Sequence, residues 1–381
     1  MKAKIGLVLL TALMMFPQIV ETIYSPALTG IASAFSVNAS QAGQTLSLYF
    51  FAFAPGVVFW GRVCDLAGRR PAVLAGLTLY GMASLLALST RSFDVLLTAR
   101  MLAAFGAAAG SVCTQTLLRD SFTGQRLALI FSVMGVALAV SPLIGMLTGT
   151  ALNHYFGYQG VFSGLALLAT TLLCWAVIKL PETRPSGVAP ISMLETLRLM
   201  SRDRHIWRTA LLVALFNLNL FSYYQLAPFE FERLGYPPAI FGYGGVILAL
   251  GTVSGAWLNK ILLSRGVRSA HLVALAGIVS LAGGIGVTIL LHFNSLMFLG
   301  AEALIVMGFG MAIPNILSAA LVDYNERKGT AGAILGLFYY LLLGGGLVLA
   351  AWLQALGWVA VGSSALVLLL VYGFTAAGSE R

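Results

Sequence analysis

The sequence predicts an all-α membrane protein with twelve transmembrane helices in two six-helix bundles. Three observations predict this fold: the composition, the number of long apolar segments, and one polar segment in the middle of the chain. Only 9% of the 381 residues are charged and 59% are hydrophobic, whereas a water-soluble domain has about a quarter charged residues. A surface this apolar needs the bilayer as its solvent.

Twelve apolar segments are long enough to cross a bilayer, which takes about 20 residues per helix. They cover approximately 5–33, 41–63, 71–90, 94–118, 126–152, 160–180, 206–231, 238–262, 270–291, 295–322, 330–353 and 357–377. Most connections are short, so neighbouring helices should be antiparallel, but the proline-containing stretch 181–205 is long and polar. We therefore expect an N-terminal bundle over 1–185, a cytoplasmic linker over 186–205 and a C-terminal bundle over 206–381.

The basic residues indicate the orientation, because Lys and Arg collect in cytoplasmic loops. With a cytoplasmic N-terminus, 19 of the 22 basic residues fall on the cytoplasmic side. Arg91 and Arg233 fall on the opposite side, and Arg100 lies within a span. We expect both termini in the cytoplasm.

Several classes of function are excluded by what the spans contain. The net charge of +9 does not indicate a nucleic-acid partner, because the basic residues stand singly or in pairs between apolar segments. The three cysteines are far apart in the sequence and lack metal-ligand spacing. No cluster of His, Glu and Asp inside the spans suggests an intramembrane enzyme. We expect no enzymatic activity, no metal and no cofactor.

A polar stretch, GRVCDLAGRR at 61–70, falls in the turn between the second and third spans. Gly61 and Gly68 permit a close helix approach and a sharp turn, and Asp65 can pair with an arginine or face a helix N-terminus. We expect a cytoplasmic latch that closes this side against the start of the eleventh span near Gly329. Its residues are Gly61, Asp65, Gly68, Arg69, Arg70 and Asp120.

The second half repeats this stretch weakly in GAWLNKILLSRGVR at 255–268, where Gly255 and Asn259 keep the spacing of Gly61 and Asp65. Together with two halves of similar length, the repeat indicates duplicated six-helix units related by an axis along the membrane normal.

The Gly-x-x-x-Asp-x-x-Gly-Arg-Arg pattern of 61–70 resembles the signature loop of the major facilitator superfamily. Other segments resemble its twelve-span drug:proton antiporters of the EmrD and Bcr/CflA branch. They are ETIYSPALTGIASAFSV (21–37), LLTARMLAAFGAAAG (96–110), LLRDSF (117–122), GVALAVSPLIGMLTG (135–149), PETRP (181–185) and KGTAGAILG (328–336). The resemblance covers the whole chain.

This resemblance implies a secondary active transporter of the bacterial inner membrane, working as a monomer. It would export small amphipathic molecules such as drugs in exchange for protons, by alternating access. The alternative is a proton-coupled exporter of one endogenous metabolite, such as a siderophore or a nucleoside.

Ionisable groups inside spans are costly and indicate function, so Glu21, Arg100 and Glu302 are the proton-coupling candidates. The resemblance places them around one central cavity. Burial there favours a neutral carboxyl and a nearby arginine favours a charged one, a competition that suits a proton-coupled switch. A fixed Glu21–Arg100 pair that only locks the helices is the alternative. Glu302 is a second candidate carrier, because Glu21 stands one residue before the family's usual acid position.

Aromatic rings beside a few amides suit amphipathic substrates, although such rings also pack against lipid or one another. The candidate substrate-binding residues are Tyr49, Phe50, Phe53, Gln115, Asn217, Asn219, Tyr223, Tyr224, Gln225, Asn315, Tyr339 and Tyr340.

The fifth span resembles the family's antiporter helix through Gly135, Pro142, Gly145 and Gly149. Small residues let helices pack closely in a membrane. We expect this helix to pack against a small-residue face of the eighth span, formed by Gly244, Gly245, Gly251 and Gly255.

Overall fold

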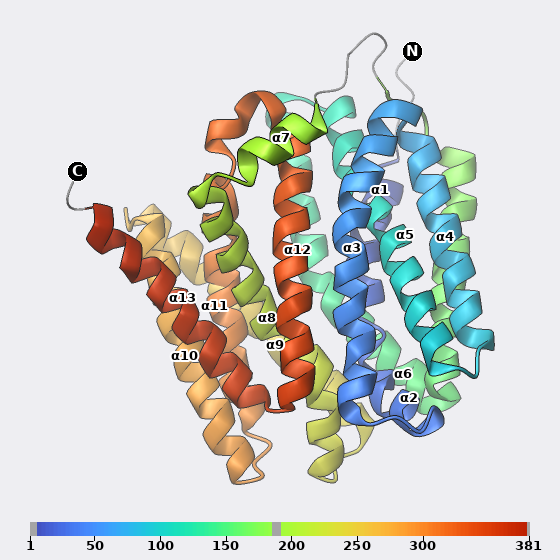
Figure 1. Cartoon of the computed structure of the whole chain (residues 1–381), viewed down its shortest axis with the longest axis vertical. Helices are drawn as coiled ribbons and strands as arrows, with labels where there is room; N and C mark the ends of the chain where they lie inside the picture. Colours follow the sequence, from blue (N-terminus) through green and yellow to red (C-terminus); the bar gives the residue numbers. More distant parts are fainter. Residues whose placement is uncertain (1–5, 185–191, 379–381) are drawn as a thin grey trace.

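The computed structural model describes residues 6–184 and 192–378, and in these residues every regular element is a helix (Figure 1). The elements are α1 (Leu7–Thr22), η1 (Ser25–Ala27), α2 (Leu28–Ala34), α3 (Ala39–Ala67), α4 (Arg69–Ser89), α5 (Phe93–Ser121), α6 (Gly124–Lys179), α7 (Met193–Met200), α8 (Arg204–Arg233), α9 (Pro238–Ser264), α10 (Ser269–His292), α11 (Phe298–Ala319), η2 (Val322–Arg327), α12 (Lys328–Leu353) and α13 (Leu356–Gly378).

These helices provide the twelve predicted spans. Ten helical segments of the described chain are long and apolar enough to cross a membrane, with α1, η1 and α2 counted as one segment. One of the ten, α6, has 56 residues and would be about 84 Å long if straight, far more than the roughly 30 Å of a bilayer core. Gly157 interrupts it with φ 64° and ψ −168°, so α6 holds two spans, and the apolar α13 completes the twelve.

The first span differs from the continuous helix expected over 5–33. It is divided into α1, the single 3-10 turn η1 and α2. Pro26 explains the interruption, because a proline has no N–H with which to continue the α-helical hydrogen bonds. This break places Glu21 in the last turn of α1 and Tyr24 immediately before η1.

The helices pack in two groups. One consists of α1, α3, α4, α5 and α6, the other of α8 to α13, and they meet where α3 packs along α12 and α6 along α9. Figure 1 shows the first group in blue to green and the second in yellow to red. The domain limits stay a prediction, and residues 185–191 at the expected boundary lie outside the described residues.

A short helix, α7, lies across one end of the bundle, beside the start of α12 (Figure 1). An ion pair between Arg327 and Glu195 (3.1 Å) holds it there, and the Tyr324 hydroxyl donates to Asp203, the N-cap residue of α8, at 2.9 Å. We call this the α7 end. The opposite end carries the start of α3 and the end of α8.

Candidate functional site

A cavity of about 390 Å³ lies between the two helix groups at the α7 end. Its walls come from α5 on one side and from α11 and α12 on the other. Gln115, Tyr339 and Tyr340, three of the predicted substrate-binding residues, line it, and Arg119 is the charged residue of its lining. Aromatic rings beside an amide give this cavity the mixed character that an amphipathic molecule needs.

Buried aromatic rings close the inner end of the cavity. Tyr340 stacks on Phe50, with ring centroids 5.9 Å apart, and meets the edge of Phe53 at 4.7 Å. Tyr49 lies behind them, 6.2 Å from Phe53. We call these four residues the aromatic layer. Three of the predicted substrate residues thus pack against one another instead of lining the cavity.

Behind the aromatic layer, Arg100 of α5 is only 1% exposed. Its Cζ atom lies 3.9 Å from the ring centroid of Tyr24 and 4.5 Å from that of Tyr49. Each such cation–π contact contributes roughly 0.5–2 kcal/mol. The Nε and Nη2 atoms of Arg100 have no hydrogen-bond partner among the described residues. The guanidinium is therefore held by ring faces while two of its donors stay unfilled.

The Glu21–Arg100 ion pair that the sequence suggested is not formed. Glu21 is 5% exposed and belongs to no ion pair of the described residues. The Tyr24 ring, three residues further along the chain, instead lies over a face of the guanidinium. An ionised carboxylate buried without a partner is strongly unfavourable, so this arrangement suits a neutral Glu21.

Glu302 lies apart from these two residues, within the second helix group, although the sequence placed all three around one space. It is fully buried, and neither of its oxygens has a hydrogen-bond partner in the described chain. The hydroxyl of Tyr223 is also unpartnered and lies against Gly244 of α9. Tyr224 of α8 lies within electrostatic reach of both carboxyls, Glu21 and Glu302.

Several amides predicted to contact substrate instead bond helices to each other. Asn219 of α8 donates to the Ser364 hydroxyl of α13 at 3.3 Å. Asn315 of α11 donates to Asn259 of α9 at 2.7 Å, and Asn217 donates to a backbone oxygen of its own helix. Buried amides are normally satisfied in this way. That these three bind substrate stays a prediction; in this conformation their described hydrogen bonds are to other parts of the protein.

The two helix groups are bonded together toward the opposite end. Gln225 of α8 donates from Nε2 to the Gly43 carbonyl at 2.8 Å and to the Ser47 hydroxyl at 2.9 Å, both on α3. The Ser25 hydroxyl donates to the backbone oxygen of Tyr224. The protein is thus joined across its midline at this end and separated by a cavity at the α7 end.

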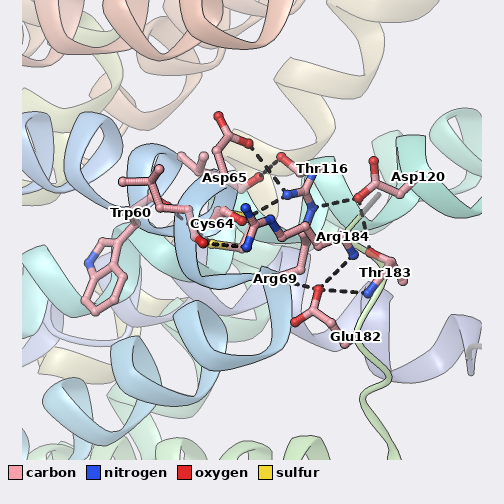
Figure 2. Close-up of polar contacts among 12 residues, drawn as sticks. Trp60, Cys64, Asp65, Arg69, Thr116, Asp120, Glu182, Thr183 and Arg184 are labelled. Carbon is pink, nitrogen blue, oxygen red and sulfur yellow. Dashed lines mark hydrogen bonds and ion pairs between the residues drawn. The ribbon is translucent and has the colours of Figure 1, made fainter. Parts of the chain in front are cut away.

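Figure 2 shows how Arg69 organises the turn between α3 and α4. Its Nε donates to Asp120 at 2.7 Å, and its Nη1 lies 3.7 Å from Asp65 and donates to the Cys64 carbonyl at 2.9 Å. The side chains of Arg69 and Asp120 are 8% and 14% exposed, whereas that of Asp65 is 41% exposed. Asp120 is therefore the stronger partner and Asp65 the weaker one.

The charged latch residues, Asp65, Arg69, Arg70 and Asp120, come from α3, α4 and α5, and their described contacts stay within the first helix group. Gly329 lines the cavity, so the expected latch contact with the start of the eleventh span is made by Gly61 and not by the charged residues. Gly61 packs against Val112 and Ala333, where an added Cβ would lie 3.5 and 3.9 Å away.

Glu182, in the PETRP segment, is a further residue of this cluster that the sequence analysis did not single out. Its carboxylate accepts hydrogen bonds from the backbone N–H groups of Arg69, Arg70, Thr183 and Arg184, at 2.8–3.1 Å. Burial alone would raise the pKa of Glu182, but these four donors outweigh it and lower the pKa below its usual value. The acid thus binds the N-terminus of α4 to the end of α6.

Gly68 makes this contact possible. It has φ 111°, which side-chain-bearing residues rarely adopt, and a Cβ there would overlap the Glu182 carboxylate. The sequence predicted a sharp turn at Gly68, and the structure confirms it.

Replacing Glu182 with glutamine should lower the free energy of unfolding by about 1 kcal/mol, a modest value because the carboxylate is exposed. Since the folded-state pKa is lowered, the contribution of Glu182 is complete above its unfolded pKa of about 4.3 and is lost as the pH falls through the folded value. Thermal unfolding in detergent at several pH values measures this. The exposed Glu232, changed to glutamine, is the control. An equal effect of both variants at neutral pH would contradict the role of Glu182.

Two of the antiporter-helix glycines, Gly145 and Gly149, pack against the first span, whereas Gly135 has open space at its Cβ position. A Cβ at Gly145 would overlap the Thr22 hydroxyl and lie 2.8 Å from the Ile19 carbonyl oxygen. A Cβ at Gly149 would lie 2.8–2.9 Å from the backbone C and Cα atoms of Ile23. Neither position has room for a methyl group, and both glycines lie against the last turn of α1 and the break that follows it.

The predicted small-residue contact between the fifth and eighth spans needs correction. Only part of it forms: Gly245 of α9 faces Met146 of α6. Gly251 and Gly255 instead lie against the backbone of α11, at Ala303 and Met307. Sequence spacing identified the small faces but not the helix that each one contacts.

Comparisons with known proteins agree with this architecture. The profile of the Major Facilitator Superfamily matches residues 10–347. An uncharacterised transporter of Rickettsia bellii is 30% identical and aligns over 90% of this chain and 88% of its own length. Multidrug resistance protein D of Escherichia coli is 26% identical, over 87% of this chain and 84% of its own. A chloramphenicol resistance protein of Pseudomonas aeruginosa is 27% identical, over 84% and 76%.

A solved structure extends the comparison to the fold. The xylose transporter XylE from E. coli, in a partially occluded inward open conformation, superposes with a TM-score of 0.74 and covers 97% of this chain and 96% of its own, at 11% identity. With the twelve helices and the profile match over most of the sequence, these findings show that the chain belongs to the Major Facilitator Superfamily of membrane transporters.

Proposed function

We propose that the protein exports small amphipathic molecules, drugs among them, in exchange for protons, working as a monomer in the inner membrane of a bacterium. The observation that carries this proposal is the buried Glu21 beside Arg100, with no ion pair between them. A carboxyl that is neutral in one conformation and charged in another can carry a proton across the membrane. Relatives named for multidrug and chloramphenicol resistance support the substrate class.

The α7 end is the cytoplasmic end in this proposal. Arg69, Arg119 and Arg184 all lie there, and positive residues are retained on the cytoplasmic side. The 390 Å³ cavity is then open to cytoplasmic substrate, and the Gln225 contacts close the periplasmic side. Alternating access would break the Gln225 contacts and bring the latch residues of α3 to α5 against the start of α12.

Exchange follows from competition between proton and substrate. From the periplasm, a proton neutralises Glu21 in the outward-open state. After closure, substrate entry and contact between Arg100 and Glu21 favour release of that proton to the cytoplasm. Each ligand shifts the equilibrium only by its different affinity for the two states, so antiport needs no direct contact between them. Glu302 is the second candidate for the carrier.

The test is chloramphenicol flux in proteoliposomes driven by a pH gradient, with Glu21→Gln, Glu302→Gln and the exposed Glu232→Gln compared with wild type. We expect Glu21→Gln to lose at least 90% of gradient-driven flux while Glu232→Gln keeps it. Loss in Glu302→Gln alone would make Glu302 the carrier. No gradient-driven flux of chloramphenicol or of a hydrophobic cationic dye in wild type would contradict drug antiport. A siderophore and a nucleoside in the same assay test the alternative of a specific metabolite.

A further inference from the structure

Two residues beside the break in the first span face the same side. Glu21 and Tyr24 are three positions apart, and Ile23 and Tyr24 keep right-handed helical dihedral angles (φ −62°, ψ −25° and φ −77°, ψ −34°). The two side chains therefore project from one side, as on a continuous helix. The Tyr24 ring covers the guanidinium of Arg100 at 3.9 Å, while the Glu21 carboxyl forms no ion pair. The two side chains thus share one side of the span, and in this conformation it is the Tyr24 ring that contacts Arg100.

The break itself is held in place by α6. The backbone at Gly149 packs so closely on that of Ile23 that a Cβ atom would not fit between them. Gly145 packs in the same way against Thr22 and Ile19. Because these contacts are with backbone atoms as well as with a side chain, a displacement of α6 must displace the break.

The same stretch of α6 also touches the other helix group. Met146 and Thr150, the neighbours of Gly145 and Gly149, lie against Gly245 and Gly242 of α9. One helical segment, 145–150, is thus in contact with the α1 break on one side and with α9 on the other. When the two helix groups move relative to each other, this segment passes the movement on to the break. It does so because close-packed atoms shift together and do not absorb a displacement gradually.

We propose that Tyr24 is a positioning residue that keeps Arg100 from Glu21 in this conformation, and that segment 145–150 transfers the arginine from Tyr24 to Glu21 when substrate entering the cavity shifts the two helix groups against each other. This rests on the proposed function, since it takes Glu21 as the proton carrier. A cation–π contact is readily exchanged for a charge-assisted hydrogen bond once the carboxyl has lost its proton. The two states then differ in their contacts with Arg100, as a coupled transition requires.

Two substitutions of Tyr24 distinguish the contribution of its aromatic ring from that of its hydroxyl. Tyr24→Phe keeps the ring and loses only a hydroxyl that has no partner in the described residues, so it should behave as wild type. Tyr24→Leu frees Arg100 to pair with Glu21 permanently. We expect it to bind chloramphenicol within twofold of wild type and to lose the proton release that binding causes, measured in weakly buffered detergent solution.

Three outcomes would overturn the role of Tyr24. They are full proton release in Tyr24→Leu, loss of chloramphenicol binding in that variant, and failure of Tyr24→Phe to match wild type. Loss of chloramphenicol binding would make Tyr24 a substrate contact. Failure of Tyr24→Phe would mean that the hydroxyl, and not the ring, is the group that matters.

The glycine substitutions test the transfer through α6. Gly149→Ala and Gly145→Ala should lose binding-induced proton release, whereas Gly135→Ala, on the same helix with open space at its Cβ position, should keep it. Thr22→Ala removes the nearest atom that a Cβ at Gly145 would meet, so it should partly restore Gly145→Ala. It should not restore Gly149→Ala, which meets backbone.

If Gly149→Ala does not fold, the comparison of Gly145→Ala with the double variant Thr22→Ala/Gly145→Ala still tests the transfer. The double variant removes the Thr22 hydroxyl, which is the closest atom that the new methyl group would overlap. Equal behaviour of the three alanine variants, or no rescue by Thr22→Ala, would overturn the transfer. Failure of the proposed function looks different: wild type itself would then release no proton, or Glu21→Gln would release as many as wild type.

Discussion

Replacing Asp120 with alanine should lower the free energy of unfolding by about 3 kcal/mol, whereas Asp65→Ala should lower it by less than about 1 kcal/mol. Loss of Asp120 leaves the Arg69 charge nearly buried without its 2.7 Å partner, and breaking a buried pair in this way costs roughly 3–5 kcal/mol. Asp65 is 3.7 Å away and 41% exposed, so solvent screens its interaction.

Thermal unfolding of the purified variants in detergent gives the order of these effects. Arg69→Gln, alone and combined with Asp120→Ala, completes a double-mutant cycle that isolates the pair. Equal destabilisation by Asp65→Ala and Asp120→Ala would contradict the ranking. Asp65→Asn should also reduce transport without reducing expression, because Asp65 is the exposed member of the latch. Wild-type flux in Asp65→Asn would remove its role in the latch.

Gln225→Ala should shift the protein toward a conformation open at the end opposite α7. The substitution removes two buried hydrogen bonds between α8 and α3, each contributing about 0.5–1.5 kcal/mol. Their sum of about 1–3 kcal/mol changes the ratio of the two conformations by roughly 5- to 150-fold.

Spin labels on cysteines placed at Gln41 and Glu232, exposed positions on α3 and α8, would report the opening as a longer distance. The exposed native Cys174 is first changed to alanine. Gln354→Ala is the matched control, because Gln354 donates to Ala351 within its own helix group. An unchanged distance distribution in Gln225→Ala would mean that this contact does not close the opposite end.

Most of the fold could be predicted from sequence because bilayer thickness sets the helix length and hydropathy marks each helix. The two details that could not be predicted are both local backbone events. Pro26 divides the first span, yet prolines at other positions, such as Pro142, lie within helices. The sequence did separate the spans 126–152 and 160–180, but it could not show that the chain turns between them at the single residue Gly157, with helix on both sides.

The candidate site was less predictable. The type of a residue determines which groups it can bond to, but only the folded structure determines which residues lie next to it. Arg100 was correctly identified as an unusual group, but its neighbours are the rings of Tyr24 and Tyr49 and not Glu21. Asn219 and Asn315 are amides of the kind that bind substrate, yet each has its partner on a neighbouring helix. Glu182 lay in a recognised motif, but only the fold brings it to the N–H groups of α4.

The aromatic layer has a consequence for energy conservation. Protons move along files of water far more easily than through packed hydrocarbon, and a continuous file from the cavity to Glu21 would discharge the membrane's proton gradient with no cargo moved. Phe50, Phe53, Tyr49 and Tyr340 fill that route with rings from both helix groups. In the proposed antiporter the stack would therefore act as electrical insulation, and a small side chain at Phe53 would turn the protein into a proton leak.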